Sequence, residues 1–279
     1  MIGLNAQQMR WAFGLAASQS SGLREMFGTM TKSFHPGRAA QNGMMSALLA
    51  EANYDSSERA IEAPRGFAPV MSDKQDYGEI INGLGETWEA ALNSYKPYAC
   101  GIVIHPTIDG CIQLRSEIEG KLDQIKTVKL RTHPLVLELT GRKKPNTELE
   151  GKFSVYHSAA CALLRGDGAP TAFTDEIVND PRIVSLRDKI EAQANPQCHE
   201  ASVDIEVIFE DDTTATKHVE RAIGSAEMPL SDDQLNTKFT VQSELVVGKD
   251  VTERFLAACW DLQTCDDVSA IARASVPNN

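Results

Sequence analysis

The spacing of apolar residues changes twice along this 279-residue chain. From Ala40 onward, apolar residues recur at i, i+4, i+7 and i+8, which is the period of a helix. Residues 203–209 instead alternate apolar and acidic side chains, and an Asp-Asp turn predicts a hairpin into residues 214–219. After Pro229 the helical spacing returns. The order of helices, a mixed block with an antiparallel sheet, and helices again predicts the α+β class.

Local signals place further elements. Capping-box patterns at Asn5 and Ser231 each predict the start of a helix. Strands are predicted at residues 88–95 and 125–130, and one continuous helix is predicted over residues 148–164.

Charge and cysteine content exclude several classes of protein. The chain carries 27 Lys+Arg against 39 Asp+Glu, and the net charge of −12 opposes binding to nucleic acid or to an anionic membrane. No uncharged apolar run approaches the roughly 18–20 residues of a membrane helix. Arg10 lies inside the first apolar stretch, unlike the charges of a signal peptide. The six cysteines form no CxxC pair, which favours reduced thiols in an intracellular protein, cytoplasmic or, as the alternative, mitochondrial.

His-Pro pairs are more frequent than six histidines and twelve prolines would give by chance. The three pairs begin at His35, His105 and His133. Because proline favours the first turn of a helix, each histidine is expected at a helix mouth, where free N–H groups can bind a carboxylate or phosphate. Lys32 and Arg38 flank the first pair, and Lys96 precedes the second. The plainer alternative, helix capping with solvated lysines, stays open at this point.

Other candidate sites carry weaker signals. His157 lies on or beside the apolar stripe of the predicted helix over residues 148–164, as a core histidine or a catalyst would. His199 and His218 flank the hairpin and are expected on the surface. No GxGxxG, Walker, GxSxG or HExxH pattern occurs, so no nucleotide, flavin or metal site is expected.

Three segments resemble the MmgE/PrpD family, which includes 2-methylcitrate dehydratase and cis-aconitate decarboxylase. The first runs through GLAASQSSG at residues 14–22 and GTMTKSFHPGRAA at residues 28–40. The second runs from YKPYAC at residues 95–100 to HPTID at residues 105–109. The third is GKFSVYHSAACALL at residues 151–164.

The resemblance implies a large all-helical domain with a smaller α+β lid domain inserted into it, the active site in the cleft between them, and a homodimer. The expected division is residues 1–88 as helical domain, 89–226 as lid, and 227–279 as helices returning to the first domain. Family members are longer, and the resemblance implies that this chain starts after an acid–base aspartate and histidines of the family.

The resemblance also implies roles for single residues. Lys32 and Lys96 match active-site lysines, and we expect both to bind carboxylates or to stabilise charge. His157 stands where the family commonly has an active-site tyrosine, with Tyr156 one step before it, and either is a candidate proton donor. His105 matches a recurrent histidine of the second segment.

We expect His35, Arg38 and His105 to bind substrate. Gly101 falls where animal decarboxylases carry a histidine, which favours dehydration over decarboxylation.

The family chemistry needs no cofactor and no metal. The first hypothesis is therefore a lyase that dehydrates a tricarboxylic acid such as 2-methylcitrate or a longer alkylcitrate. Cations would stabilise the charge that develops after a proton is removed beside a carboxylate. The alternatives are a cis-aconitate-type decarboxylase, a dicarboxylate isomerase or epimerase, and a catalytically impaired homologue or one half of a split enzyme.

Overall fold

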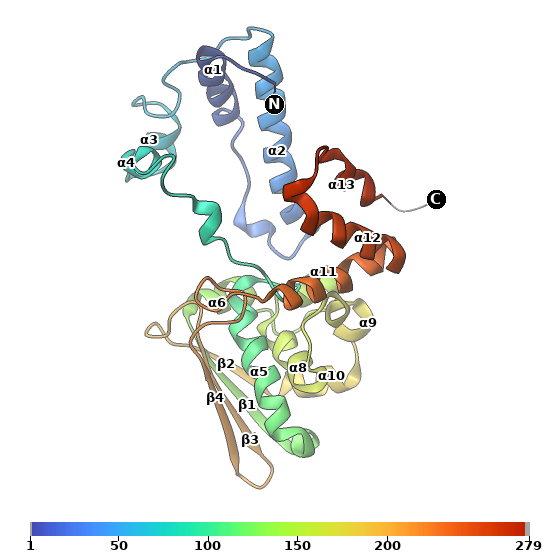
Figure 1. The fold of residues 1–279 in the computed structure, drawn as a ribbon. Helices are drawn as coiled ribbons and strands as arrows, with labels where there is room; N and C mark the ends of the chain where they lie inside the picture. Colours follow the sequence, from blue (N-terminus) through green and yellow to red (C-terminus); the bar gives the residue numbers. More distant parts are fainter. Residues whose placement is uncertain (1, 277–279) are drawn as a thin grey trace. The chain divides into compact units, whose positions relative to one another are not determined.

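The computed structural model describes residues 2–276. Contacts between Cα atoms divide the chain into two compact units, Met1–Ala91 and Leu92–Asn279, and each unit is described here by itself (Figure 1). An inserted lid, with both ends of the chain in one helical domain, stays a prediction.

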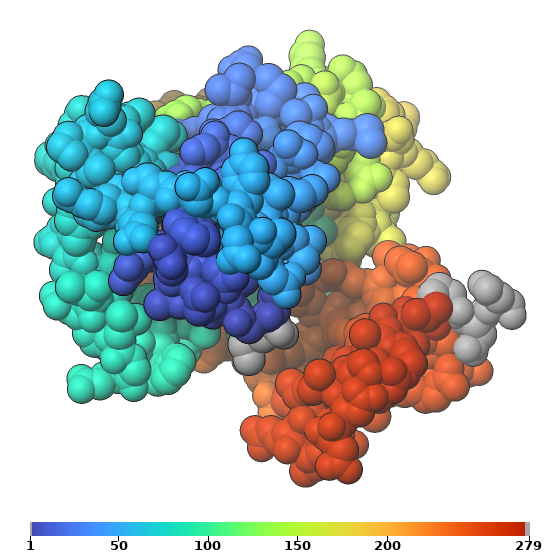
Figure 2. Space-filling view, turned by 90° about the horizontal axis from the view of Figure 1, so that it is seen from above, coloured from blue at the N-terminus to red at the C-terminus, as the bar shows by residue number. Residues whose placement is uncertain are grey.

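The first unit is helical. Its helices are α1 (Ala6–Ala17), α2 (Met30–Glu51), α3 (Phe67–Met71) and α4 (Gly78–Ile81). The capping box at Asn5 is confirmed, because its side chain accepts from the Gln8 amide at 2.9 Å and the Gln8 side chain accepts from the Asn5 amide at 3.1 Å. α1 packs against α2 and, through hydrogen bonds of Gln7 and Arg10 to Glu58, against the segment that follows α2; Figure 2 views these segments from above.

The prediction that His35 stands at a helix mouth is wrong. α2 begins at Met30, and Pro36 lies inside it. Proline in a helix removes one i→i−4 hydrogen bond, and here the carbonyl that loses its donor belongs to Lys32, in the first turn. That region is largely open to solvent. Water can therefore replace the lost donor, and the helix can start before the proline.

The second unit holds the sheet and most of the core. Its longer helices are α5 (His105–Ile118), α6 (Pro134–Thr140), α8 (Val155–Arg165), α10 (Pro181–Asp188), α11 (Asp232–Val247), α12 (Lys249–Trp260) and α13 (Ser269–Ala274), with short α7 (Glu148–Gly151) and α9 (Asp175–Val178). Its strands are β1 (Ile125–Thr132), β2 (Ile190–Ala194), β3 (Val203–Phe209) and β4 (Thr214–Val219). Here the His-Pro predictions hold: His105 is the first residue of α5, and His133 caps α6 by accepting from the Leu135 amide.

The sheet has the order β2-β1-β3-β4 and is mixed. β3 pairs antiparallel with β1 and with β4, so the predicted hairpin is confirmed. β2, which the sequence reading did not identify, pairs parallel with β1. The predicted antiparallel sheet is therefore present in β1, β3 and β4, and β2 adds a parallel strand, because helices α6 to α10 return the chain to the opposite end of β1 before β2 begins.

One face of the sheet forms the core. Val203, Ile205, Val207 and Phe209 of β3 are buried, while Asp204, Glu206 and Ile208 between them are only partly covered, as the alternation predicted. α5 packs over β3 and β4, and α8 packs against α5 (Figure 1). At Gly110 of α5, an added Cβ would lie 2.6 Å from Ile205 Cδ1 and 2.9 Å from Val219 Cγ2. The close approach of helix to sheet therefore depends on this glycine.

Two further expectations are corrected. Residues 88–95 form no strand; a 3-10 turn (Glu89–Leu92) lies there, since the segment contains no β-branched residue. The helix predicted over residues 148–164 is broken into α7 and α8 by residues 152–154, where Ser154 caps α8 by accepting from the His157 amide at 3.1 Å.

Each of the C-terminal helices α11, α12 and α13 packs against the next one along the chain. α11 starts at the predicted capping box of Ser231 and packs on α12 through the rings of Phe239 and Phe255, whose centroids are 5.0 Å apart. Among the residues described, no helix is both long and apolar enough to cross a membrane.

Candidate functional site

The segment that carries Lys96 is anchored to the second unit by backbone hydrogen bonds. The Tyr95 amide donates to the Gly224 carbonyl at 2.9 Å, and the Ala99 amide donates to the Gly168 carbonyl at 2.9 Å. The Gly101 amide donates to the Lys152 carbonyl at 3.1 Å. These bonds fix the backbone on both sides of Lys96 although the segment is neither helix nor strand.

Lys96 is a cation without a carboxylate partner within residues 2–276. Its Nζ donates to the Cys100 carbonyl at 3.3 Å. Burial raises the pKa of the Cys100 thiol to about 12, while the charges of Lys96 and Lys152 act in the opposite direction. The ammonium groups of Lys96 and Lys152 therefore both act on the Cys100 thiol. The sequence pointed only to Lys96. Lys152, which also pairs with Glu148 at 2.5 Å, was missed although it lies in the third segment, residues 151–164.

His105 lies at the start of α5 and is 3% exposed. Its Nε2 is buried and has no hydrogen-bond partner, and its ring meets the Tyr98 ring edge-on at 5.3 Å. Burial, together with the charge of Lys96, lowers the pKa of His105 to about 4, against the opposing effect of backbone hydrogen bonds at Cys100 and Tyr98. The ring is therefore neutral at neutral pH.

A buried ring nitrogen without a partner costs free energy. A ligand carboxylate near His105 and Lys96 would satisfy this nitrogen and would also raise the pKa of the ring. The free N–H groups at the start of a 14-residue helix add a partial positive charge at the same end. The arrangement can therefore hold an anion.

Asp109 is a buried acid that sequence reasoning did not single out. Its carboxylate accepts from Gln113 Nε2 at 3.2 Å and from the Ile223 amide at 3.2 Å. Asp109 also raises the pKa of Tyr98, although burial of the phenol is the larger cause. The aspartate one turn after His105 thus ties α5 to the segment that follows β4.

The structure places His157 in the core. The residue is fully buried, its Nε2 lies 2.9 Å from the Ala172 carbonyl, and Cys161 Sγ lies 3.4 Å from the same nitrogen. Burial is the main cause that lowers its pKa to about 4, and the charge of Arg187 adds to it. Tyr156 is half-buried, with Lys143 Nζ 5.4 Å from its ring centroid, and burial raises the pKa of its phenol.

The remaining predicted residues lie in the first unit, on α2. Lys32 is half-buried with its Nζ 5.9 Å from the Phe27 ring centroid, and Arg38 is exposed and donates to Gln41 Oε1 at 2.8 Å. His35 is half-buried and, with Arg38, lines a hollow of about 340 Å³. The structure thus brings together Lys96 with His105 in the second unit, and His35 with Arg38 in the first.

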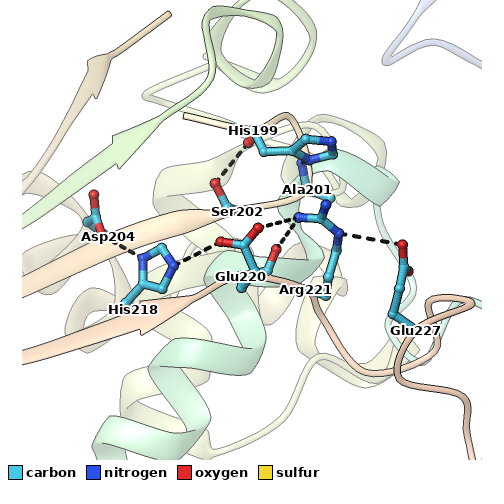
Figure 3. Close-up of polar contacts among 8 residues, drawn as sticks. All are labelled: His199, Ala201, Ser202, Asp204, His218, Glu220, Arg221 and Glu227. Atoms are coloured by element: carbon cyan, nitrogen blue, oxygen red, sulfur yellow. Dashed lines mark hydrogen bonds and ion pairs between the residues drawn. The ribbon is translucent and has the colours of Figure 1, made fainter. Parts of the chain in front are cut away.

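A second group of charged residues lies on the open face of the sheet (Figure 3). His218 of β4 lies between Asp204 and Glu220, with Nδ1 2.7 Å from Asp204 Oδ1 and Nε2 3.2 Å from Glu220 Oε2. Arg221 forms an ion pair with Glu220, with Nη1 2.9 Å from Oε1, and its Nε lies 3.7 Å from Glu227 Oε1. His199 and His218 are on the surface, as the sequence predicted. Across residues 2–276 no group of three His, Cys, Asp or Glu side chains is arranged to hold a metal ion.

Comparison with known families gives two separate matches along the chain. Residues 1–80 match the MmgE/PrpD N-terminal domain, and residues 98–262 match the MmgE/PrpD C-terminal domain. The chain belongs to the MmgE/PrpD family.

Relatives with assigned activities are distant and longer. The cis-aconitate decarboxylase of Mus musculus is 23% identical over 285 residues, a match that covers 98% of this chain and 58% of the relative. The cis-aconitate decarboxylase of Aspergillus terreus is 21% identical over 97% of this chain and 60% of its own length. The mitochondrial 2-methylcitrate dehydratase of Yarrowia lipolytica is 24% identical over 68% of this chain and 38% of its own length. The chain thus spans less than two thirds of the length of these relatives, all of which are lyases by name.

Proposed function

We propose that this protein is a lyase acting on a small polycarboxylate, with dehydration of a 2-methylcitrate-like or alkylcitrate-like acid as the first reaction and cis-aconitate-type decarboxylation as the alternative. One observation carries the proposal: the ammonium group of Lys96, which has no carboxylate partner among the residues described, near His105, whose buried Nε2 has no partner either. Family membership and the activities of the relatives support the reaction class.

The chemistry needs few groups. In dehydration, a base takes the proton beside a carboxylate, the C–O bond breaks, and an acid protonates the departing hydroxyl, so that one water leaves. In decarboxylation, the C–C bond to the carboxylate breaks, CO₂ leaves, and an acid protonates the carbanion. Both reactions develop negative charge that nearby cations stabilise. We assign carboxylate binding and charge stabilisation to Lys96 and Lys32, and hydrogen bonding to His105.

Tyr156 and His157 are the proposed proton donors. The half-buried phenol of Tyr156 can be reached, whereas the ring of His157 is enclosed and bonded to Ala172. We therefore put Tyr156 first and His157, whose ring contacts the Ala172 carbonyl, second. Gly101 supports dehydration over decarboxylation: a Cβ there would lie 3.2 Å from Thr140 Cγ2, so the histidine of animal decarboxylases fits only if Thr140 moves.

Purified protein incubated with 2-methylcitrate, longer alkylcitrates and cis-aconitate tests the proposal, with substrate loss followed by mass spectrometry. Lys96→Met should reduce kcat/KM for the turned-over acid by about 100-fold or more, the effect of removing one charge-stabilising donor. Lys121→Met is the matched control, since Lys121 pairs with Asp211 at the surface at 3.3 Å. No turnover of any acid by folded protein would contradict the proposal, and exchange of deuterium without elimination would indicate the isomerase alternative.

A second candidate is that the chain is one half of a split enzyme or a catalytically impaired homologue. A specific observation favours it: the described part of the first unit buries only two apolar side chains, Ala12 and Ala50, while Met30, Phe34 and Met44 are exposed. Such a surface is typical of an interface. If turnover appears only when a polypeptide matching the remainder of the relatives is added, this candidate replaces the first.

A further inference from the structure

We propose that the hollow between α1 and α2 in the first unit binds a small monocarboxylate with an apolar body, such as an aliphatic acid of medium chain length. This goes beyond the lyase proposal, because the hollow lies wholly within the first unit and gives His35 and Arg38 a ligand other than the tricarboxylate that the sequence predicted for them. The volume of about 340 Å³ is within the range of small-molecule sites.

Most of the wall is apolar. α1 contributes Phe13, Ala16 and Ala17, and the segment after α2 contributes Ile61 and Phe67. The rings of Phe13 and of Phe34 on α2 are 57% and 60% exposed, although both face the hollow. A hydrocarbon body placed there would cover these rings, and removal of apolar surface from water favours binding.

One edge of the hollow is cationic. His35 and Arg38 are three residues apart on α2 and therefore share a helix face, which both turn to the hollow. Arg38 donates through one nitrogen to Gln41, and within residues 2–276 neither side chain meets a carboxylate. Arginine presents further N–H groups in a planar fork that suits a carboxylate.

Hydrogen bonds hold the polar edge of the hollow in place. Asn42, 8% exposed and one turn beyond Arg38, donates to the Gln19 carbonyl at 3.1 Å, and Gln19 Nε2 donates to Ser46 Oγ at 3.2 Å. These bonds hold the loop that carries Ser20 and Ser21 against α2, so that both residues also line the hollow.

The loop is further fixed at Gly22, whose φ of +128° disfavours any side chain and whose absent Cβ would lie 3.5 Å from the His35 ring. The His35 ring lies beside this glycine.

The distribution of charge defines the ligand class. One cation, Arg38, at a single edge matches one carboxylate, whereas a tricarboxylate would place its remaining charges against Phe13, Ile61 and Phe67, where no polar group compensates them. An amine ligand would meet Arg38 as a like charge. An acid with one carboxylate and a hydrocarbon body satisfies both the edge and the wall.

The experiment is calorimetric titration of the full chain with hexanoate, with hexan-1-ol as the uncharged probe and propane-1,2,3-tricarboxylate as the probe without an apolar body. We expect hexanoate to bind at least about 10-fold more tightly than either, which is the ratio given by one charge-assisted hydrogen bond. Arg38→Gln should weaken hexanoate by about 10-fold and leave hexan-1-ol unchanged. Arg59→Gln, in the same unit but paired with Glu62 at 3.3 Å, is the matched control and should have no effect.

Ala16→Leu, which fills the apolar wall, should abolish binding of both hexanoate and hexan-1-ol while circular dichroism stays unchanged. Equal affinity for hexanoate and the tricarboxylate, no hexanoate binding at millimolar concentration, or binding that Arg38→Gln leaves intact would each overturn the inference. Because binding is measured without turnover, failure of the substrate panel leaves this result standing, and failure here leaves the lyase proposal standing.

Discussion

His105 and His157 are both buried in the second unit, and burial lowers the pKa of each ring to about 4 from an ordinary value of 6.5. Well above pH 6.5 both rings are neutral in the folded and the unfolded chain. Between pH 6.5 and pH 4 the unfolded chain takes up protons that the folded chain does not, so stability falls as the pH falls. At pH 5 each histidine costs about 2 kcal/mol of unfolding free energy.

His157→Gln should remove the contribution of His157 to the pH dependence of the unfolding free energy, because glutamine can donate to the Ala172 carbonyl but does not titrate. We expect urea unfolding of the second unit to depend less on pH between 7 and 5 in this variant than in the natural protein. His199→Gln, at an exposed ring, is the control and should keep the natural dependence. Identical pH dependence in all three proteins would contradict the prediction.

The pKa of His218 is shifted in the opposite direction from those of His105 and His157. Hydrogen bonds to Asp204 and Glu220 raise its pKa, so any stabilisation is present below pH 6.5 and is lost as the pH rises through the folded pKa. The ring is exposed, and solvent keeps the contribution to stability small. NMR titration should therefore give a His218 pKa above 6.5 that drops in Asp204→Asn, with little change in unfolding free energy. A pKa at or below 6.5 in the natural protein would be inconsistent with the contacts in Figure 3.

Single residues were predictable from the sequence where local chemistry decides their place. The caps at Asn5 and Ser231 and the helix start at His105 depend on neighbours within a few positions, and all three are confirmed. Lys152 and Asp109 were missed because their partners, Cys100 and Ile223, reach them only through the fold. The roles of the predicted site residues stay predictions.

At the scale of elements, the contact of α5 with the sheet depends on Gly110. Gly110→Ala adds a methyl group that would lie 2.6 Å from Ile205 Cδ1 and 2.9 Å from Val219 Cγ2. Overpacking of this kind costs about 1–3 kcal/mol, and we expect the unfolding free energy of the second unit to fall by that amount in urea. Gly120→Ala is the matched control, because no atom lies within 4 Å of the added methyl group. Equal stability of the two variants would show that α5 can move away at no cost.

Elements with a strong period were predictable, and those set by distant contacts were not. β3 and the hairpin to β4 were read from alternation alone. β2 was missed because its sequence, IEAQA, alternates over only five residues with a single β-branched side chain, and its register depends on pairing with β1 across nearly sixty residues of chain. The start of α2 was missed because Pro36 was expected in the first turn of the helix. The five residues before His35, which begin at Met30, are already helical.

At the scale of the whole molecule, the two units differ in how much apolar surface they bury. The second unit contains a continuous cluster of buried side chains from α5, α8 and the sheet, including Ile108, Leu163 and Ile205. In the described part of the first unit only Ala12 and Ala50 are buried among apolar residues. Burial of apolar area is the main favourable contribution to folding, so the first unit has little stability of its own.

We therefore expect hydrogen exchange of the 279-residue chain to separate the two units. Amides of α1 and α2 should exchange at least about 100-fold faster than those of α5 and β3, which corresponds to a difference of roughly 3 kcal/mol in opening free energy. The matched comparison is between α2 and α5, since both are longer than ten residues and differ chiefly in burial. Addition of hexanoate should slow exchange in α1 and α2 and leave α5 unchanged, because a ligand stabilises the state that binds it. Equal protection in α2 and α5 in the unliganded chain would show that the exposed side chains of the first unit are covered in solution, for instance by a second copy, and light scattering on the same sample would detect that copy.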